Sequence, residues 1–378
     1  MPTALAPAND NLNIRGSAVI YRLFDVGYAI DLNRVQLLLA PATLERARPE
    51  RVEAQALQIP NPPVTVSVST RDFVIDGAAC HTVLSARFFD FGVCSLQLEV
   101  VPTNDLGWDA FVAFSRVLRR SSEVNQILEE ELASLRERLA PAIERPALAP
   151  VSEEYMVFRV SQLRDGTGAF VDPSSALSDE RLAPLLLGEP RPLAPTAMRA
   201  LLSHRFSYYL DDLVVLSWEN ALVLEPAVND RDVEYILEFA NAQLLELRVY
   251  DSALDAELPL MYDQVAEARQ RRLPLPTRRF QGVLARLQAR VADVTETVER
   301  AENALKVTDD VYLARIYAGA LELFRAQEWR RGIERKLEIF RETYAMLNDE
   351  AQAARAELLE SAILLIIFVE LILGLVRS

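Results

Sequence analysis

The sequence predicts an α+β protein with two small α+β units of the ferredoxin-like type, a long helical or coiled-coil bundle, and a C-terminal transmembrane helix. Short β-branched and aromatic runs alternate with helix-like runs up to residue 228. Helix formers with heptad spacing then fill residues 229–357, and residues 358–378 are almost continuously apolar. The expected segments are a disordered N-terminus (1–13), a first α+β unit with closing helices (14–145), a linker (146–154), a second α+β unit (155–228), a helical hairpin or coiled-coil region (229–357) and a transmembrane anchor (358–378).

Composition limits the classes of function. The chain has 378 residues, 51% of them hydrophobic, and a net charge of −15. This acidity argues against a main surface that binds DNA by neutralising phosphates. Cys80 and Cys94 are too few for a disulfide framework or a zinc site by themselves, so we expect buried thiols in a reducing compartment. The first thirteen residues contain no basic and apolar regions of a secretory signal.

Within the first unit, Ser17–Phe24 predicts a strand and Asp31–Leu39 a helix. Asn104 and Asp105 are expected to cap a helix that begins near Trp108. Further strands are expected at Val64–Thr70, Thr82–Phe88 and Gly92–Val100, and a further helix at Glu123–Leu139. The second unit repeats this order loosely, with strands at Tyr155–Ser161, Arg205–Leu210, Leu213–Trp218 and Ala221–Leu224 and a helix at Asp179–Leu187.

The helical region carries two heptad seams, in which apolar residues recur at alternating steps of three and four. We assign oligomerisation to these positions: Leu284, Leu287, Val291, Val294, Val298, Leu305, Ile333, Leu337, Phe340, Tyr344 and Leu347. A break at Asp309–Asp310 is expected to cap a new helix. The seams could pair within one chain or between chains, and self-association into a homo-oligomer is the expectation.

The last segment predicts a membrane anchor. From Leu358 to Val376 a helix would extend roughly 28 Å, close to the thickness of a bilayer core. Glu370 falls inside this segment. Its carboxyl would be protonated or hydrogen-bonded to the Glu370 side chains of other copies, or it would reach the far membrane–water interface near Arg377. A third interpretation is that the terminal segment is a hydrophobic core helix of a soluble protein. The anchor implies contact with membrane lipid and a single-pass C-terminal location, with the body in the cytoplasm.

Two polar features of the helical region have competing readings. Asn241 and Gln243 lie in an amphipathic helix, where they form a solvated face or a polar pin that selects one helix register. An arginine cluster brackets Pro274 and Pro276. The electrostatics of helix ends explains part of it. The alternative is contact with an anionic surface such as lipid headgroups or ribosomal RNA. The cluster consists of Arg269, Arg271, Arg272, Arg278 and Arg279.

Signatures of catalysis are missing from the sequence. There is no GxxxxGK[ST], HExxH, GxSxG or paired CxxC, and His81 and His204 are the only histidines. The Asp165–Gly168 stretch lacks the lysine of a phosphate loop, so a β-turn is expected there. The sequence therefore predicts a protein that is not an enzyme, with no catalytic residues, no cofactor and no metal.

The C-terminal half resembles the family named "required for meiotic nuclear division". The resemblance covers about Tyr155–Ser378 and rests on Leu213–Val223, Ile236–Asp251, Asp309–Tyr317 and the terminal apolar segment with its internal glutamate. It implies a membrane-associated homo-oligomer without known catalytic activity, whose mitochondrial members support translation. Since no mitochondrial presequence is visible, the chain looks like a bacterial member.

These observations predict a tail-anchored, self-associating membrane scaffold without catalytic activity. A ribosome or a membrane complex is a further expected partner, and DNA is not. The alternative is a membrane-tethered ligand sensor with a pocket between the two α+β units.

Overall fold

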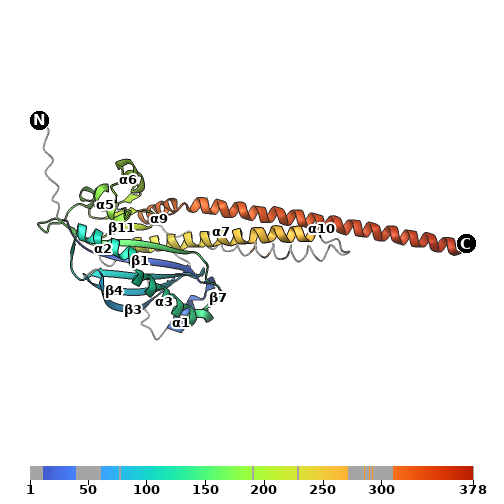
Figure 1. The fold of residues 1–378 in the computed structure, drawn as a ribbon, viewed down its shortest axis with the longest axis horizontal. Coiled ribbons are helices and arrows are strands. Elements are labelled where there is room, and N and C mark those ends of the chain that lie inside the picture. Colours follow the sequence, from blue (N-terminus) through green and yellow to red (C-terminus); the bar gives the residue numbers. More distant parts are fainter. Residues whose placement is uncertain are drawn as a thin grey trace. The chain divides into compact units, whose positions relative to one another are not determined.

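The computed structural model describes residues 12–39, 61–75, 78–189, 191–227, 230–270 and 310–377, with isolated helical positions at 285, 289 and 292. Figure 1 shows the order of the elements. The strands are β1 (Asn13–Asp25), β2 (Gly27–Ile30), β3 (Val64–Ile75), β4 (Ala78–Phe88), β5 (Val93–Pro102), β6 (Leu106–Gly107), β7 (Ile143–Pro146), β8 (Ser152–Arg164), β9 (Arg205–Phe206), β10 (Leu213–Leu216) and β11 (Asn220–Leu224). The helices are α1 (Leu32–Leu39), α2 (Trp108–Arg120), α3 (Ser122–Leu139), the 3-10 turn η1 (Ala140–Ala142), α4 (Pro173–Ala176), α5 (Asp179–Leu186), α6 (Pro195–Leu201), α7 (Asp232–Gln270), α9 (Val311–Leu323) and α10 (Ala326–Arg377).

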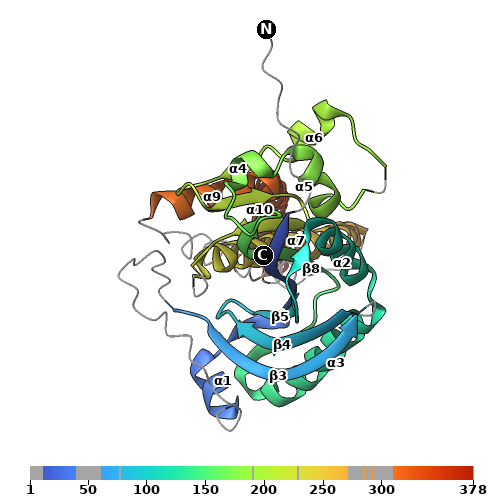
Figure 2. The ribbon, with the colours of Figure 1, turned by 90° about the vertical axis from the view of Figure 1, so that its left-hand side faces the viewer.

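One mixed sheet dominates the fold. Among the described residues it has nine strands in the order β3-β4-β5-β1-β8-β11-β10-β9, with β6 paired to β1. The pairs are antiparallel except β8 and β11, which are parallel. Figure 2 shows β3, β4 and β5 side by side in the curved part of the sheet. Strands β2 and β7 form a separate two-stranded sheet.

The prediction of two separate ferredoxin-like units is wrong. Strand β1 pairs with β8 from Asn13 opposite Arg164 to Phe24 opposite Ser152, so the two predicted units share one sheet. The structure is α+β with a large mixed sheet, and the strand residues of both halves contribute to one core. Local patterns predicted the strands themselves, but the partner of each strand depends on contacts far apart in sequence.

The central strands β1 and β8 are buried on both faces of the sheet, and alternate residues of each strand divide between these faces. Ile20 of β1 and Phe158 of β8 belong to an apolar core that also contains buried side chains of α2, α3 and α5. Their neighbours Tyr21 and Arg159 are buried as well, but they lie outside that core on the opposite face. The second face therefore accommodates polar and charged side chains.

The chain divides into two compact units. The first comprises Met1–Val249 with Ala301–Gln327, and the second comprises Tyr250–Arg300 with Glu328–Ser378. Within the second unit Lys336 of α10 forms ion pairs with Asp251 and Asp255 of α7, at 2.6 Å in both cases. The second unit buries its own apolar positions along these helices: Leu254, Met261, Val265, Ile333, Leu337, Phe340 and Leu347.

No helix among the described residues is long and apolar enough to cross a membrane. The predicted C-terminal transmembrane anchor is therefore wrong. The membrane localisation with a cytoplasmic body, which rested on that anchor, is corrected with it.

Two predicted caps have different outcomes. Asp310 caps α9 as expected, because its Oδ1 accepts hydrogen bonds from the backbone N of Tyr312 and Leu313. The expected cap of α2 is wrong, because Gly107 occupies that position. Asp105 instead forms an ion pair with Arg15 of β1 at 2.9 Å.

Candidate functional site

The side of α7 that faces the sheet is charged. Glu234 and Glu238 lie one helical turn apart and are only 2% and 1% exposed. The Nε of Arg159, on β8, lies 2.9 Å from Glu234 Oε1, and Arg87, on β4, pairs with Glu238. Gln97 Nε2, on β5, donates to Glu238 Oε1 at 2.7 Å. We call these five residues the ion-pair layer, which fixes α7 on the sheet through matched charges.

Burial shapes the electrostatics around this layer. It raises the pKa of Glu234, although the positive charge of Arg159 opposes the shift. Further along α7, Arg248 pairs with Glu153 of β8, and burial likewise raises the pKa of Glu153 against the effect of Arg248. Buried carboxylates are costly unless paired, and these carboxylates are paired with arginine. The arrangement is suited to holding elements together, since its charges are already engaged.

The two residues predicted as a register pin are both buried in the first unit. Asn241 Nδ2 donates to the carbonyl oxygen of Leu237, one turn earlier in the same helix, at 2.8 Å. Gln243 Oε1 accepts a hydrogen bond from the hydroxyl of Tyr317, so it connects α7 to α9. The alternative of a solvated face is wrong for these two side chains. Their role in selecting a helix register stays a prediction.

The predicted oligomerisation seam divides into two parts. Its first part lies outside the described residues: Leu284, Leu287, Val291, Val294, Val298 and Leu305. Its second part lies on α10, where Ile333, Leu337, Phe340 and Leu347 are buried within the chain and Tyr344 is half-buried. The oligomerisation role of these residues stays a prediction. Their burial shows that this part of α10 is already covered in a single chain.

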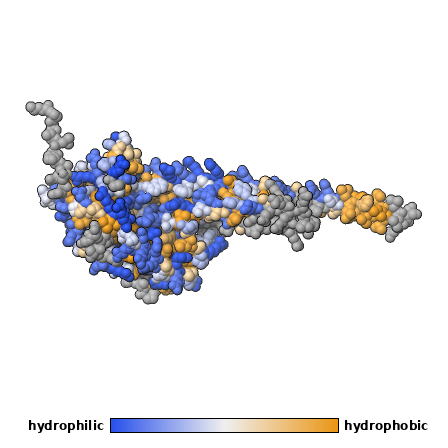
Figure 3. All heavy atoms as spheres, viewed as in Figure 1, coloured by the Kyte–Doolittle hydropathy of each residue, from blue (hydrophilic) through white to orange (hydrophobic). Residues whose placement is uncertain are grey.

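The end of α10 presents the opposite situation. Every described side chain from Leu359 to Leu373 is exposed. Eleven of them are large and apolar and are between 44% and 67% exposed: Leu359, Ile363, Leu364, Leu365, Ile366, Ile367, Phe368, Val369, Leu371, Ile372 and Leu373. Figure 3 shows the hydrophobic side chains gathered at this end of the helix. We call this surface the α10 apolar end. Glu370 is an exposed carboxylate within it, and its predicted position inside a membrane is corrected with the anchor.

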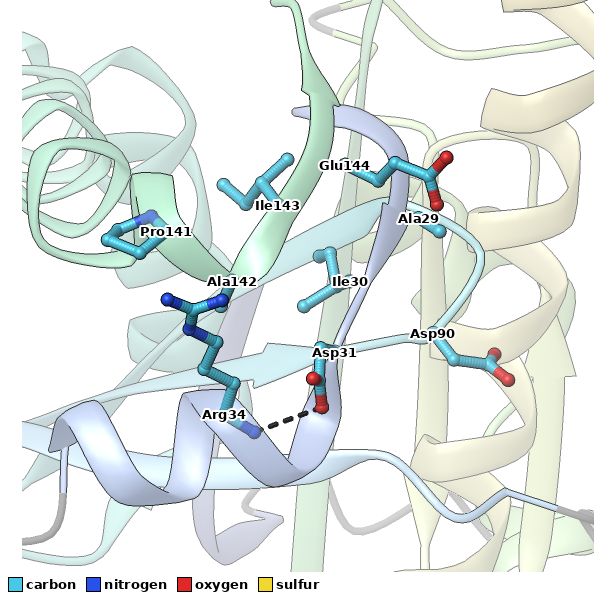
Figure 4. Close-up of a pocket in the computed structure, with 9 residues that line it drawn as sticks. All are labelled: Ala29, Ile30, Asp31, Arg34, Asp90, Pro141, Ala142, Ile143 and Glu144. Atoms are coloured by element: carbon cyan, nitrogen blue, oxygen red, sulfur yellow. Dashed lines mark hydrogen bonds between the residues drawn. The ribbon is translucent and has the colours of Figure 1, made fainter.

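A shallow pocket lies beside α1, β2, β7 and η1 (Figure 4). Its volume is about 420 Å³, and its charged lining residues are Asp31, Arg34, Asp90 and Glu144. Asp31 Oδ1 already accepts a hydrogen bond from the backbone N of Arg34, at the start of α1. The pocket therefore lies within the N-terminal half, at a different place from the ligand pocket that the alternative function expects between the two halves.

Other residues singled out in the sequence have local roles. The Asp165 turn is confirmed, because its carboxylate accepts from Thr167 N at 2.8 Å and Ala169 N at 3.1 Å. Cys94 is buried, which raises the pKa of its thiol to about 12. The Nε2 atom of His204 lies 3.8 Å from Oε2 of Glu322. Among the described residues no group of three His, Cys, Asp or Glu side chains is arranged to hold a metal ion.

The predicted arginine cluster falls largely outside the described residues. Arg269 belongs to α7, but its side chain is among those that the structure does not describe. Arg271, Arg272, Arg278 and Arg279 lie in the stretch that follows α7, which is not described. Contact of this cluster with an anionic surface stays a prediction.

These features define a class of α+β protein that has a large mixed sheet, a charged helix buried against it, and a long C-terminal helix whose apolar end is exposed. A family profile described as "Uncharacterized protein MJ0711, N-terminal domain" matches residues 15–231, more than half of the chain. The chain therefore belongs to this family. The predicted membership of the meiotic nuclear division family, as a bacterial member, is wrong, because the family model and the archaeal relative that match the chain belong to a different family.

One relative is the uncharacterized protein MJ0711 of Methanocaldococcus jannaschii. It is 24% identical over 214 residues, which are 55% of this chain. The match spans 63% of the length of the archaeal protein. No solved structure matches the chain.

Proposed function

We propose that this chain is a non-catalytic scaffold that associates with further copies of itself through the α10 apolar end. The observation that supports the proposal is the exposure of eleven large apolar side chains between Leu359 and Leu373. Fully burying one such side chain contributes roughly 1.5–3 kcal/mol, so an uncovered surface of this kind strongly favours association. The paired charges beneath α7 support a structural role, since they are already engaged with one another.

A second copy suits this surface because identical helices can pack symmetrically. The heptad of α10 passes through Leu337, Phe340, Tyr344 and Leu347, and its steps of four and three continue to Leu365, Phe368 and Ile372. In that register Leu365 and Ile372 occupy a positions, whereas Glu370 lies on the outer side at f. Apolar residues also fill outer positions, so an assembly of more than two helices would bury more of the surface.

The test compares two double variants of the full chain. Leu365→Glu/Ile372→Glu changes two a positions, and Ile366→Glu/Leu373→Glu changes the b positions next to them, with the same spacing of seven residues. The two pairs are similarly exposed, at 63% and 44% against 60% and 54%. We expect the original chain to sediment as an oligomer, the a-position variant as a single chain, and the b-position variant as an oligomer.

Circular dichroism of each variant shows whether the helices are retained. An original chain that sediments as a single copy at every concentration tested would refute the proposal. So would two variants with the same mass as the original chain, because association would then not use the α10 apolar end.

A further inference from the structure

A second exposed surface lies in the first unit, where the β9–β10 turn meets the start of α9. Tyr208, Tyr209 and Leu210 are 66%, 64% and 92% exposed, and Val311 of α9 is 75% exposed. The Tyr208 ring lies 4.8 Å from the Tyr209 ring and 5.4 Å from the Tyr312 ring, between ring centroids. We call these five residues the tyrosine patch.

The fold holds this patch in a defined arrangement. Both carboxylate oxygens of Asp212 accept from Tyr208 N, at 2.8 and 3.1 Å, which fixes the turn. Helix α9 approaches closely because it carries Gly319 at the contact, where an added Cβ would lie 2.6 Å from the ring of Phe206. The patch is therefore a preorganised surface, and exposing it in a fixed shape lowers the cost of binding a partner.

Carboxylates surround the patch. The negative charges of Asp230 and Asp212 contribute to the raised pKa of Glu225, after burial as the largest cause. Burial also raises the pKa of the Tyr312 hydroxyl, and the nearby Asp212 and Glu225 add to the shift. Two of the acidic side chains contact the tyrosine backbone directly, since Asp212 Oδ1 accepts from Tyr208 N at 2.8 Å and Asp310 Oδ1 accepts from Tyr312 N at 2.7 Å. A positively charged partner whose groups also stack on aromatic rings suits this surface.

The chain contains a segment with this chemistry. Residues 269–279 read Arg-Gln-Arg-Arg-Leu-Pro-Leu-Pro-Thr-Arg-Arg, and no acidic residue occurs between Ala268 and Ala292. Its five arginines make this segment strongly positive, although the whole chain has a net charge of −15. Peptides with a Pro-x-Pro sequence favour polyproline II, the conformation that aromatic surfaces recognise in other proline-rich ligands.

We propose that the tyrosine patch binds the proline–arginine segment, residues 269–279, of a second copy of this chain. The arginines stack on Tyr209 and Tyr312 and pair with the surrounding carboxylates, while the Pro-Leu-Pro sequence lies against Leu210. This contact goes beyond association through α10 because it uses a different surface and a different kind of recognition. It would place copies head to tail, a type of contact that can extend an assembly beyond a closed pair.

The first experiment measures binding of a labelled peptide, residues 268–281, to the full chain by fluorescence anisotropy. The full chain carries Leu365→Glu/Ile372→Glu, so that the outcome does not depend on association through α10. We expect saturable binding that weakens as salt is added, because part of the attraction is electrostatic. A peptide in which the arginines are replaced by glutamine should bind at least about tenfold more weakly.

Variants of the chain test where the peptide binds. Tyr209→Ser should weaken binding about two- to fivefold, the range expected for an exposed cation–π contact. Asp211 is an exposed carboxylate that follows Leu210 in the same turn. Asp211→Asn should weaken binding to a similar extent, and the double change should weaken it more. Tyr262→Ser is the matched control, since Tyr262 is 54% exposed on α7, and it should leave binding unchanged. Absence of peptide binding, or an equal loss in the control, would overturn the proposal.

A mixing experiment tests whether the contact joins two copies. One chain carries Tyr209→Ser/Asp211→Asn and the other carries glutamine at Arg271, Arg272, Arg278 and Arg279, both with the α10 substitutions. Each chain alone lacks an intact contact, whereas the mixture has one intact patch and one intact segment. We expect energy transfer between labels only in the mixture. A mixture that shows none would overturn binding between copies, because a contact within one chain cannot be restored by mixing.

Discussion

The first turns of α7 and the last turns of α10 invert the usual relation between polarity and burial. Glu234 and Glu238 of α7 are charged and almost fully buried, whereas Leu365 and Phe368 of α10 are apolar and more than half exposed. Soluble proteins normally show the reverse arrangement. Each exception requires a partner, and the difference lies in where that partner is found.

For α7 the partner is the sheet of the same chain. Arg87 and Arg159 project from strands whose neighbouring residues form the apolar core, and they meet the glutamates of α7 one turn apart. For the α10 apolar end no such match exists among the described residues, since every described side chain from Leu359 to Leu373 is exposed. Burial of charge therefore points to contacts made within the chain, and exposure of apolar side chains points to contacts between chains.

The largest loss of stability is expected from breaking one buried ion pair, Arg87–Glu238. Glu238→Gln keeps the shape of the side chain but leaves the positive charge of Arg87 without its counter-ion on α7. Removing one member of a buried pair costs about 3–5 kcal/mol, so the free energy of unfolding should fall by that amount in a denaturant titration.

Two further variants sharpen this result. Asp263→Asn changes an exposed carboxylate on the same helix and should alter stability by less than about 0.5 kcal/mol. Arg87→Met/Glu238→Met removes both charges and should recover most of the loss. If Glu238→Gln behaved like the Asp263 control, the ion-pair layer would not hold α7 on the sheet.

A smaller effect is expected at a buried carboxyl whose hydrogen-bond partner is a backbone amide instead of an arginine. Asp25 Oδ1 accepts from Gly27 N at 3.1 Å, and burial raises the pKa of Asp25 from 3.8 to about 6. The folded state therefore binds this proton more tightly than the unfolded state. Its contribution to stability is present below about pH 4 and is lost as pH rises through about 6, by about 3 kcal/mol.

Asp25→Asn removes this titration. We expect the variant to be more stable than the original chain at pH 7 and to lose less stability between pH 4 and pH 6. Denaturant titrations at a series of pH values measure both quantities, with Asp263→Asn again as the control. A pH dependence that is unchanged in Asp25→Asn would show that another group causes it.

The smallest effect is expected in the second unit, where charges lie nearer to solvent. Lys336→Gln removes the ion pairs with Asp251 and Asp255, which should cost about 1 kcal/mol. Arg341→Gln is the control, because Arg341 is exposed and lies 3.6 Å from Glu338, and it should cost less than about 0.5 kcal/mol. Equal losses in the two variants would show that the Lys336 pairs add nothing specific.

Local structure could be predicted from the sequence because its signals are local. The helix at Asp179–Leu187 corresponds to α5, and the strand at Val64–Thr70 lies within β3. The single sheet could not be predicted, because it depends on β1 pairing with β8, more than a hundred residues away along the chain. A period-two pattern predicts a strand, and it does not identify the neighbouring strand.

The surfaces were harder to predict for the same reason. Arg87 and Glu238 are 151 residues apart, and neither local sequence indicates the other. A signal was present in Arg87 and Arg159, each of which lies between two apolar residues of a strand, since a charge in such a position needs a partner. The apolar character of the α10 apolar end was visible in the sequence, but apolar character alone does not distinguish a lipid from a second helix.

Hydrogen exchange at two protein concentrations tests the contrast between α7 and α10 in a single measurement. We expect amides of residues 232–249 to exchange slowly at both concentrations, because their partners belong to the same chain. Amides of residues 359–373 should exchange rapidly in dilute solution and more slowly as concentration rises and copies associate. Equal exchange of residues 359–373 at the two concentrations would contradict association through the α10 apolar end.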